Sequence, residues 1–302
     1  MTTYAYSFHG LNLIVCGEEA VLTALHARLG RFPAGNTQEA ADLHFEFHKV
    51  ADTSRHVVQR PAGPGRSVFD PGLGESAYFD ASQQLYLEVP GRGRALCDVK
   101  SRRVRISYPE SEACDPWLLA HLFFTIPLAE LLKRFGLYMV HAAGLAVAGK
   151  GLLVAGQSGA GKTTLALALL RAGFDFLADD TVFLSLGKSG LRILAFPDEV
   201  DVTAQTLGFF PELQRQAHAP KPNDRLKQPI CATSLYRVKP SWECAPEAMI
   251  FPQPGKSSGS ILTPMPKAEA LVQLVCNVLR TEPRSSQAHL DALAGLVKPY
   301  RR

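Results

Sequence analysis

The sequence predicts an α/β protein, with a mostly-β (α+β) region at residues 1–112 and an α/β core at residues 113–302. Three observations support this prediction. Apolar and polar residues alternate at residues 43–48, as in a half-buried strand. The composition changes near Pro116, where a long apolar stretch begins. An apolar run at residues 152–155 then leads through a glycine-rich loop into a helical segment, an order typical of α/β cores.

The composition is that of a globular protein with a sizeable core, since 46% of its 302 residues are hydrophobic and 20% are charged. A net charge of +4 is too small to indicate a nucleic-acid partner. The N-terminal ten residues lack the basic and apolar regions of a signal peptide, and no apolar stretch is long enough to span a membrane. Six scattered cysteines without metal spacing favour a reducing, cytoplasmic location: Cys16, Cys97, Cys114, Cys231, Cys244 and Cys276.

The elements of the N-terminal region follow from local patterns. Residues 4–16 have the character of a strand, and residues 21–29 have helical spacing. Residues 61–74 are rich in proline and glycine and are predicted to form a loop. Short links of turn residues then separate three strands of a predicted meander, at residues 85–89, 95–99 and 104–108. We expect the region of residues 1–112 either to hold the substrate or to build an oligomer interface, and nothing in it is diagnostic of one role.

The elements of the core are predicted in the same way. A long helix is expected at residues 116–135, then strands at 137–147 and 152–155, with the helix after the loop at 162–171. Gly173 is expected to cap that helix. Strands at 174–186 and 191–196 come next, whereas residues 211–260 have little regular pattern. Helices are expected again at 267–279 and 287–297.

The glycine-rich loop Gly156-Gln157-Ser158-Gly159-Ala160-Gly161-Lys162-Thr163 fits G-x-x-x-x-G-K-[ST] at every fixed position. Backbone N–H groups of such a loop turn toward phosphates, and the following helix adds its positive N-terminal dipole. The lysine supplies a cation to the outer phosphates and the threonine a hydroxyl to magnesium. We therefore expect ATP and Mg²⁺ as cofactors, bound through Gly156, Ser158, Gly159, Ala160, Gly161, Lys162, Thr163 and Thr164. The bland alternative is a glycine-rich turn.

Two acidic residues and one histidine flank this loop in the sequence. Asp179 and Asp180 follow an apolar run, where carboxylates are costly unless they meet a cation or a reacting proton. One of them could reach magnesium and the other an attacking hydroxyl; turn or cap aspartates are the alternative. His141 lies within the predicted strand before the loop, and neighbouring strands could bring it beside Asp179. A lone histidine in a strand is more often structural.

The run from His141 to Asp180 resembles the catalytic core of the HPr kinase family: a histidine–alanine strand, a P-loop, a helix ending at glycine, then Ala178-Asp179-Asp180. The resemblance implies a core related to phosphoenolpyruvate carboxykinase and a serine-directed kinase. It implies that Asp179 is the general base, that His141 is its partner, and that Asp180 and Thr163 are magnesium-side ligands. Lys162 completes the implied catalytic set.

The chain departs from the family pattern in two places. It has Thr164 where HPr kinase has glutamate, and it lacks a Glu-Arg-Gly-Leu-Gly-type segment after Asp180. Phosphorylase activity is therefore not expected, and Glu199 or Asp201 is a candidate replacement for the missing magnesium ligand. The whole chain is similar to divergent relatives from peptide-modification clusters, some of which phosphorylate a serine of a precursor peptide such as a lasso peptide.

A basic segment at residues 214–239 is the candidate substrate grip, with Arg225 and Lys227 as the chosen residues. A solvated loop is the alternative. The expected partner is a small protein or peptide with an acceptor serine, without nucleic acid or membrane, and the resemblance implies a homo-oligomer. Two other functions remain open: a kinase of a small-molecule hydroxyl, and a non-catalytic ATP-binding regulatory protein.

Overall fold

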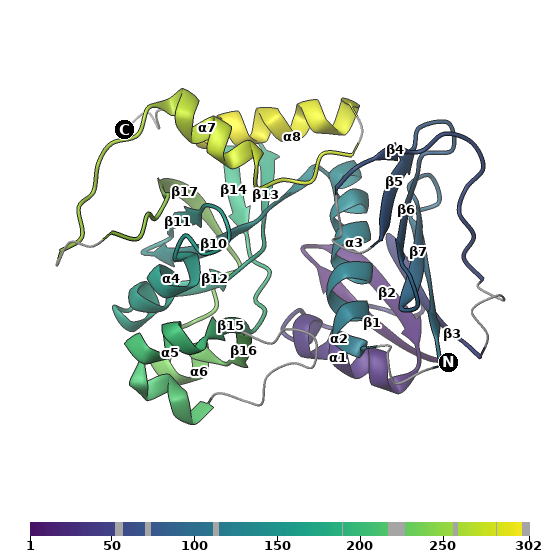
Figure 1. Ribbon diagram of the computed structural model, residues 1–302, viewed down its shortest axis with the longest axis horizontal. Coiled ribbons are helices and arrows are strands. Elements are labelled where there is room, and N and C mark those ends of the chain that lie inside the picture. The colour runs from purple at the N-terminus through teal and green to yellow at the C-terminus, as the bar shows by residue number, and fades with distance from the viewer. Residues whose placement is uncertain are drawn as a thin grey trace. The chain divides into compact units, whose positions relative to one another are not determined.

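The computed structural model describes residues 1–51, 57–69, 74–110, 115–188, 190–216, 227–255, 259–281 and 283–297. The fold is mixed α/β and divides into two compact units (Figure 1). Unit 1 comprises Met1–Phe135 and Leu279–Ser286, and unit 2 comprises Gly136–Val278 and Gln287–Arg302. None of the described helices has both the length and the apolar character that crossing a bilayer requires.

Unit 1 is built on a sheet with the strand order β1-β2-β3-β8-β7-β6-β5-β4. The neighbours β2–β3 and β3–β8 are parallel and the other pairs are antiparallel. The alternating residues at 43–48 do form a strand, with Leu43, Phe45 and Phe47 buried. The strands are β1 (Thr2–Phe8), β2 (Leu11–Gly17), β3 (Leu43–Val50), β4 (Arg66–Ser67), β5 (Glu75–Phe79), β6 (Gln84–Val89), β7 (Gly93–Asp98) and β8 (Arg103–Pro109).

Helices α1 (Glu19–Leu29), α2 (Pro116–Leu118) and α3 (Phe124–Leu132) belong to the same unit. The single helix expected at residues 116–135 is interrupted: a π-helical turn at Leu119–Phe123 joins α2 to α3, and a 3₁₀ turn at Lys133–Phe135 ends the run. Pro127 explains the interruption, because it has no N–H to donate to the carbonyl of Phe123 one turn earlier. The packing of Phe124 on Phe45, with ring centroids 4.8 Å apart, fixes this helix against β3.

The single strand expected at residues 4–16 is two strands, β1 and β2, joined by a tight turn. His9 and Gly10 both have positive φ, of 49° and 85°, as a two-residue hairpin of the primed type requires. The register pairs Phe8 with Leu11 directly across this turn. The sequence prediction missed the turn because His-Gly is a weak hairpin signal compared with Asn-Gly or Asp-Gly.

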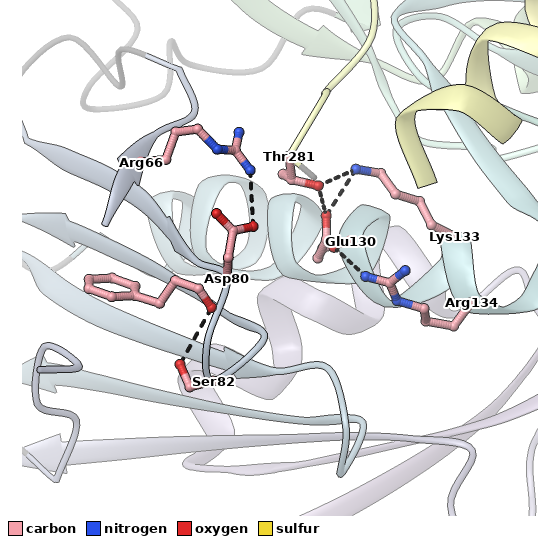
Figure 2. A network of polar contacts seen from close by, with 8 residues as sticks. Arg66, Asp80, Ser82, Glu130, Lys133, Arg134 and Thr281 are labelled. Carbon is pink, nitrogen blue, oxygen red and sulfur yellow. Dashed lines mark hydrogen bonds and ion pairs between the residues drawn. The ribbon is translucent and has the colours of Figure 1, made fainter. Parts of the chain in front are cut away.

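A buried polar network ties the short segment 279–286 into unit 1 (Figure 2). Lys133 Nζ donates to Glu130 Oε2 at 2.9 Å and to Thr281 Oγ1 at 2.7 Å. Arg134 Nη2 donates to the other oxygen of Glu130 at 3.2 Å, and the Thr281 hydroxyl donates to Oε2. The side chains of Glu130 and Lys133 are 0% and 1% exposed, so each charge depends on its partner rather than on water.

Unit 2 contains a sheet with the order β12-β10-β11-β17-β14-β13-β9 and a separate pair, β15-β16. Only His141 separates β9 from β10, although the two strands lie toward opposite ends of this order, so the sheet must curl. The strands are β9 (Leu137–Val140), β10 (Ala142–Val147), β11 (Lys150–Ala155), β12 (Asp175–Ala178), β13 (Val182–Gly187), β14 (Gly190–Leu194), β15 (Val200–Thr203), β16 (Lys227–Ile230) and β17 (Glu243–Ile250).

The helices of unit 2 cover both faces of its sheet. One core cluster joins Val154 to Leu167 and Leu207, from α4 and α5, and another joins Leu153 to Leu274 and Leu293, from α7 and α8. The neighbouring residues Leu153 and Val154 of β11 therefore point into different cores, because successive side chains of a strand lie on opposite faces of the sheet. The helices are α4 (Lys162–Arg171), α5 (Ala204–Phe209), α6 (Ala232–Tyr236), α7 (Lys267–Val275) and α8 (Pro283–Leu296), with a 3₁₀ turn at Pro211–Gln216.

Two sequence expectations for unit 2 are corrected. The strands expected at 137–147 and 174–186 are each broken, at His141 and at residues 179–181, because the chain changes partner strand at these points. The segment 211–260 contains β16, α6 and β17, and β17 lies between β11 and β14. Pro246 lies within this central strand, and the register between β11 and β17 shifts beside it: Gly151 pairs with Pro246, and Leu152 pairs with Ala248.

The substitution Glu130→Gln tests the buried network. It is expected to lower the free energy of unfolding by about 3–5 kcal/mol, because Lys133 would stay buried without a carboxylate. The matched control is Glu247→Gln, whose ion pair with Lys150 is 3.3 Å long and exposed. That change should stay within about 0.5 kcal/mol. Urea unfolding measures both; equal, small losses would contradict the proposed role of Glu130.

Candidate functional site

Strand directions bring four segments of unit 2 to one edge of its sheet. Strands β11 and β17 are parallel, and β10 is antiparallel to both β11 and β12. The C-terminal ends of β11, β12 and β17 and the N-terminal end of β10 therefore meet at the same edge. The glycine-rich loop, the Asp179-Asp180 pair, residues 251–255 and His141 follow or precede these ends directly.

The glycine-rich loop connects β11 to the first residue of α4. Gly159 and Gly161 have φ angles of 81° and 91°, a conformation that side chains with a Cβ rarely adopt. The loop is largely exposed, whereas Lys162 is only 8% exposed. The ammonium group of Lys162 curls back to donate to the carbonyls of Gly156 at 2.9 Å and Gln157 at 3.4 Å. The loop thus surrounds a cation at a helix N-terminus, an arrangement suited to an anionic ligand.

Asp179 lies directly after β12 and is buried beside the start of α4. The Thr163 hydroxyl donates to its Oδ2 at 3.2 Å, and its Oδ1 is buried without a hydrogen-bond partner. Burial, with the neighbouring charge of Asp180, raises the pKa of Asp179 to about 8, although the Thr163 hydrogen bond acts in the opposite direction. A buried carboxyl oxygen without a donor needs either a proton or a cation.

Asp180 and His141 form a second, more exposed pair. His141 Nε2 lies 3.5 Å from Asp180 Oδ1, and their side chains are 43% and 61% exposed. Burial of the ring, partly offset by Asp180, lowers the pKa of His141. The backbone N–H of His141 donates to the carbonyl of Asn277 at 2.8 Å, which fixes the chain where it changes partner strand. Sequence reasoning missed Asn277, since a backbone carbonyl after a helix has no signature in the sequence.

The pairing differs from the one that the sequence resemblance implies. The resemblance couples His141 with Asp179 and places Thr163 and Asp180 on the metal side. The structure brings Thr163 to Asp179 and His141 to Asp180. Both carboxylates and both partners nevertheless lie at the same sheet edge.

Lys227 and Asp201 extend the site from the paired strands β15 and β16. Lys227 is close enough to oppose the positive charges of His141 and Lys162 and to lower the pKa of Asp179. Asp201 raises the pKa of Asp179. Arg225, the other residue chosen from the basic segment, lies outside the described residues.

The remaining predicted residues lie at the margins of this arrangement. The Thr164 hydroxyl is 3.3 Å from the Thr206 hydroxyl of α5, so it faces the interior of the unit. Ser158 is exposed on the loop, and Ala160 is half-buried. The N–H of Glu199 is bonded by Asp198 Oδ1 at 2.8 Å, in the link before β15. Within the described part of the chain, no group of three or more His, Cys, Asp or Glu side chains is arranged to hold a metal ion.

Sequence reasoning also missed the segment after β17. A Cβ built on Gly156 would lie 3.9 Å from Pro252, and one built on Gly161 would lie 4.0 Å from Pro254. The two prolines therefore lie beside the loop. Their sequence signal was the low complexity of residues 252–260, which is typical of a linker and not of a segment beside a binding site.

Asp179→Asn tests the buried carboxyl group. Its pKa of about 8 lies above the ordinary value of 3.8, so the folded chain binds more protons than the unfolded chain between these values. Burial of Asp179 therefore costs progressively more stability as pH rises through that window, by up to about 1.4 kcal/mol per pH unit. The variant, which cannot ionise, should gain stability over the wild type with the same slope.

Urea unfolding in metal-free buffer over a pH series measures this difference. Thr163→Val is the matched control, because it removes the hydroxyl that holds Asp179 while leaving the titrating group. A difference between Asp179→Asn and wild type that does not change with pH would contradict the raised pKa.

Comparisons with known proteins leave the chain without a family assignment. No family model matches it, and no curated protein matches it. Among solved structures, it is similar in part to the Hpr(Ser) kinase/phosphatase from Coxiella burnetii, with 17% sequence identity and a TM-score of 0.25. The match covers 37% of this chain and 65% of that chain, so it spans slightly less than two thirds of the neighbour's length.

Proposed function

We propose that the chain is an ATP-dependent serine kinase, which transfers the γ-phosphoryl group to a serine hydroxyl of a small protein or ribosomal precursor peptide. The proposal rests on one observation: a candidate phosphate-binding loop and a candidate acid–base pair lie at the same edge of the sheet. The glycine-rich loop with Lys162 is suited to phosphates, and the Asp180–His141 pair is suited to a proton. The strand-loop-helix order and the flanking acidic strand end support a P-loop core of the HPr kinase and phosphoenolpyruvate carboxykinase type.

The residues present fit a nucleotide and its metal ion. The loop from Gly156 to Thr164 would hold the phosphates through its N–H groups and through Lys162. Thr163 and Asp179 would hold Mg²⁺, since the unpartnered Oδ1 of Asp179 is a buried oxygen that a cation satisfies. When bound, Mg²⁺·ATP supplies the phosphoryl group and neutralises its developing charge. Burial lowers the pKa of Lys162, and the nearby charges of Asp180 and Asp179 oppose that effect.

Asp180 is the proposed general base. Its side chain is 61% exposed, so an incoming hydroxyl can reach it, whereas Asp179 is 4% exposed. His141, 3.5 Å away, orients the Asp180 carboxylate and can share the proton that it accepts. Late proton removal suffices in a loose phosphoryl-transfer transition state, so an ordinary carboxylate is adequate for this role.

Asp179 is the alternative base, and one observation favours it. Its pKa of about 8 is near that of an effective base at neutral pH. Its burial opposes that role, because only 4% of Asp179 is exposed to an incoming hydroxyl. Lys227 serves either assignment, as a second cation beside the transferring group, and Arg225 is proposed to act with it on the acceptor.

Lys162→Ala is expected to abolish phosphorylation of the acceptor, by about 10²-fold or more, because the outer phosphates lose their cation. Lys150→Ala is the matched control: this lysine is exposed on the same strand-loop-helix unit and pairs with Glu247. Transfer of radiolabelled phosphate from ATP to candidate peptides, proteins and small alcohols measures the loss. ATP binding without transfer to any acceptor would overturn the kinase proposal in favour of a regulatory nucleotide-binding protein.

Asp180→Asn and Asp179→Asn separate the two base assignments. Asp180→Asn should reduce kcat by about 10²–10⁴-fold with little change in the Mg²⁺ concentration needed for half-maximal nucleotide binding. Asp179→Asn should instead raise that Mg²⁺ concentration. Single-turnover phosphate transfer and a fluorescent ATP analogue give the two readouts. The reverse pattern would assign the base to Asp179, and full activity in both variants would refute a carboxylate base.

A further inference from the structure

A thiol, an imidazole and a carboxylate lie next to one another on one face of the sheet of unit 1. Cys16 is on β2, and His44 and Glu46 are on the parallel strand β3, where the register pairs Cys16 with Glu46. Cys16 Sγ lies 3.6 Å from His44 Nε2, and His44 Nδ1 lies 3.1 Å from Glu46 Oε1. These three side chains occupy the face opposite to the buried Val15, Leu43 and Phe45.

The surroundings of His44 favour a neutral ring that accepts a proton from the thiol. Burial of the ring lowers the pKa of His44; Glu46 acts in the opposite direction, and Arg103 of β8 acts in the same direction as burial. The carboxylate beside Nδ1 favours the tautomer with its proton there, although the contact is an ion-pair distance without hydrogen-bond geometry. The lone pair of Nε2 then faces Cys16. Thr3 of β1 adds a hydroxyl 3.4 Å from the sulfur.

Cys16 has an imidazole partner, and its surroundings differ from those of the other described cysteines. Burial raises the pKa of the Cys97 thiol well above its usual range and that of Cys244 to about 11, so both are unreactive. Cys231 contacts a threonine hydroxyl and Cys276 a backbone carbonyl, at 3.6 Å each. Cys16 combines an imidazole partner with partial exposure, which is the environment of a nucleophilic thiol.

We propose that Cys16 is a modification site that undergoes exchange with low-molecular-weight disulfides of the glutathione type, with His44 as its base. His44 Nε2 takes the thiol proton, and the Cys16 thiolate attacks one sulfur of the small disulfide. The new bond joins Cys16 to that sulfur while the original S–S bond breaks. The leaving thiolate takes the proton from His44, so one protein thiol and one disulfide become one mixed disulfide and one small thiol.

Incubation of the full chain with oxidised glutathione, followed by peptide mapping, tests the proposal. Cys16 should form the mixed disulfide at pH 7, and dithiothreitol should reverse it. His44→Gln should slow the reaction roughly three- to fivefold at pH 7, because the thiol loses the imidazole that takes its proton. The slowing should disappear at pH 10, where hydroxide in solution replaces the imidazole as the base. This comparison keeps the accessibility of Cys16 constant.

Two controls make the result decisive. The rate at Cys276, an exposed cysteine in unit 2, should be unchanged in His44→Gln, which shows that the slower reaction is specific to Cys16 and not a property of the reagent. His48→Gln removes the next imidazole on the same face, which lies 3.4 Å from Glu46, and should leave the rate at Cys16 unaffected. An unmodified Cys16, or equal rates at pH 7 in wild type and His44→Gln, would overturn the proposal.

Discussion

The buried carboxyl group of Asp179 is the central electrostatic feature of the candidate site. Asp179 follows β12 directly, and the sheet places it beneath the first turn of α4 with one oxygen on Thr163 and the other without a donor. Such a group favours whatever supplies positive charge, whether a proton or a cation. The adjacent Asp180 increases that demand. The glycine-rich loop, the start of α4 and the neighbouring strand ends all lie around this carboxyl group.

Two consecutive aspartates consequently have unlike environments. Asp179 is enclosed and shares a hydrogen with a helical hydroxyl, whereas Asp180 faces outward toward an imidazole. Adjacent residues after a strand point to different sides, so a change of one position separates a buried carboxyl group from an exposed one. Unlike environments of paired carboxylates are the usual basis for dividing roles between them. Lys227 adds a cation from a different strand pair, so that several elements contribute charge to a small volume.

The loop and its helix could be predicted from sequence, because both are local: α4 begins at Lys162 and ends at Arg171 as expected, and Gly173 has the positive φ of a cap. The break at His141 could not, since it depends on β9 pairing with β13 and β10 with β11, which are distant partners. The strand β17 contains Pro246, a residue type that is rare in central strands, and its register with β11 shifts at the next residue, Glu247. The pairing of His141 with Asp180 rather than Asp179 likewise depends on side-chain directions that spacing alone does not determine.

The short segment 279–286 has a consequence for how the chain is divided. The polypeptide leaves unit 2 after α7, contributes Thr281 to the Glu130–Lys133 network, and then returns to unit 2. Neither unit is therefore one continuous stretch of sequence. A fragment that ends at Phe135 would lack Thr281, so Lys133 and Glu130 would lose their hydroxyl partner. To express unit 1 separately, residues 279–286 would have to be joined to residues 1–135. Unit 1 is complete only after synthesis has passed residues 279–286, which follow most of unit 2 in the chain.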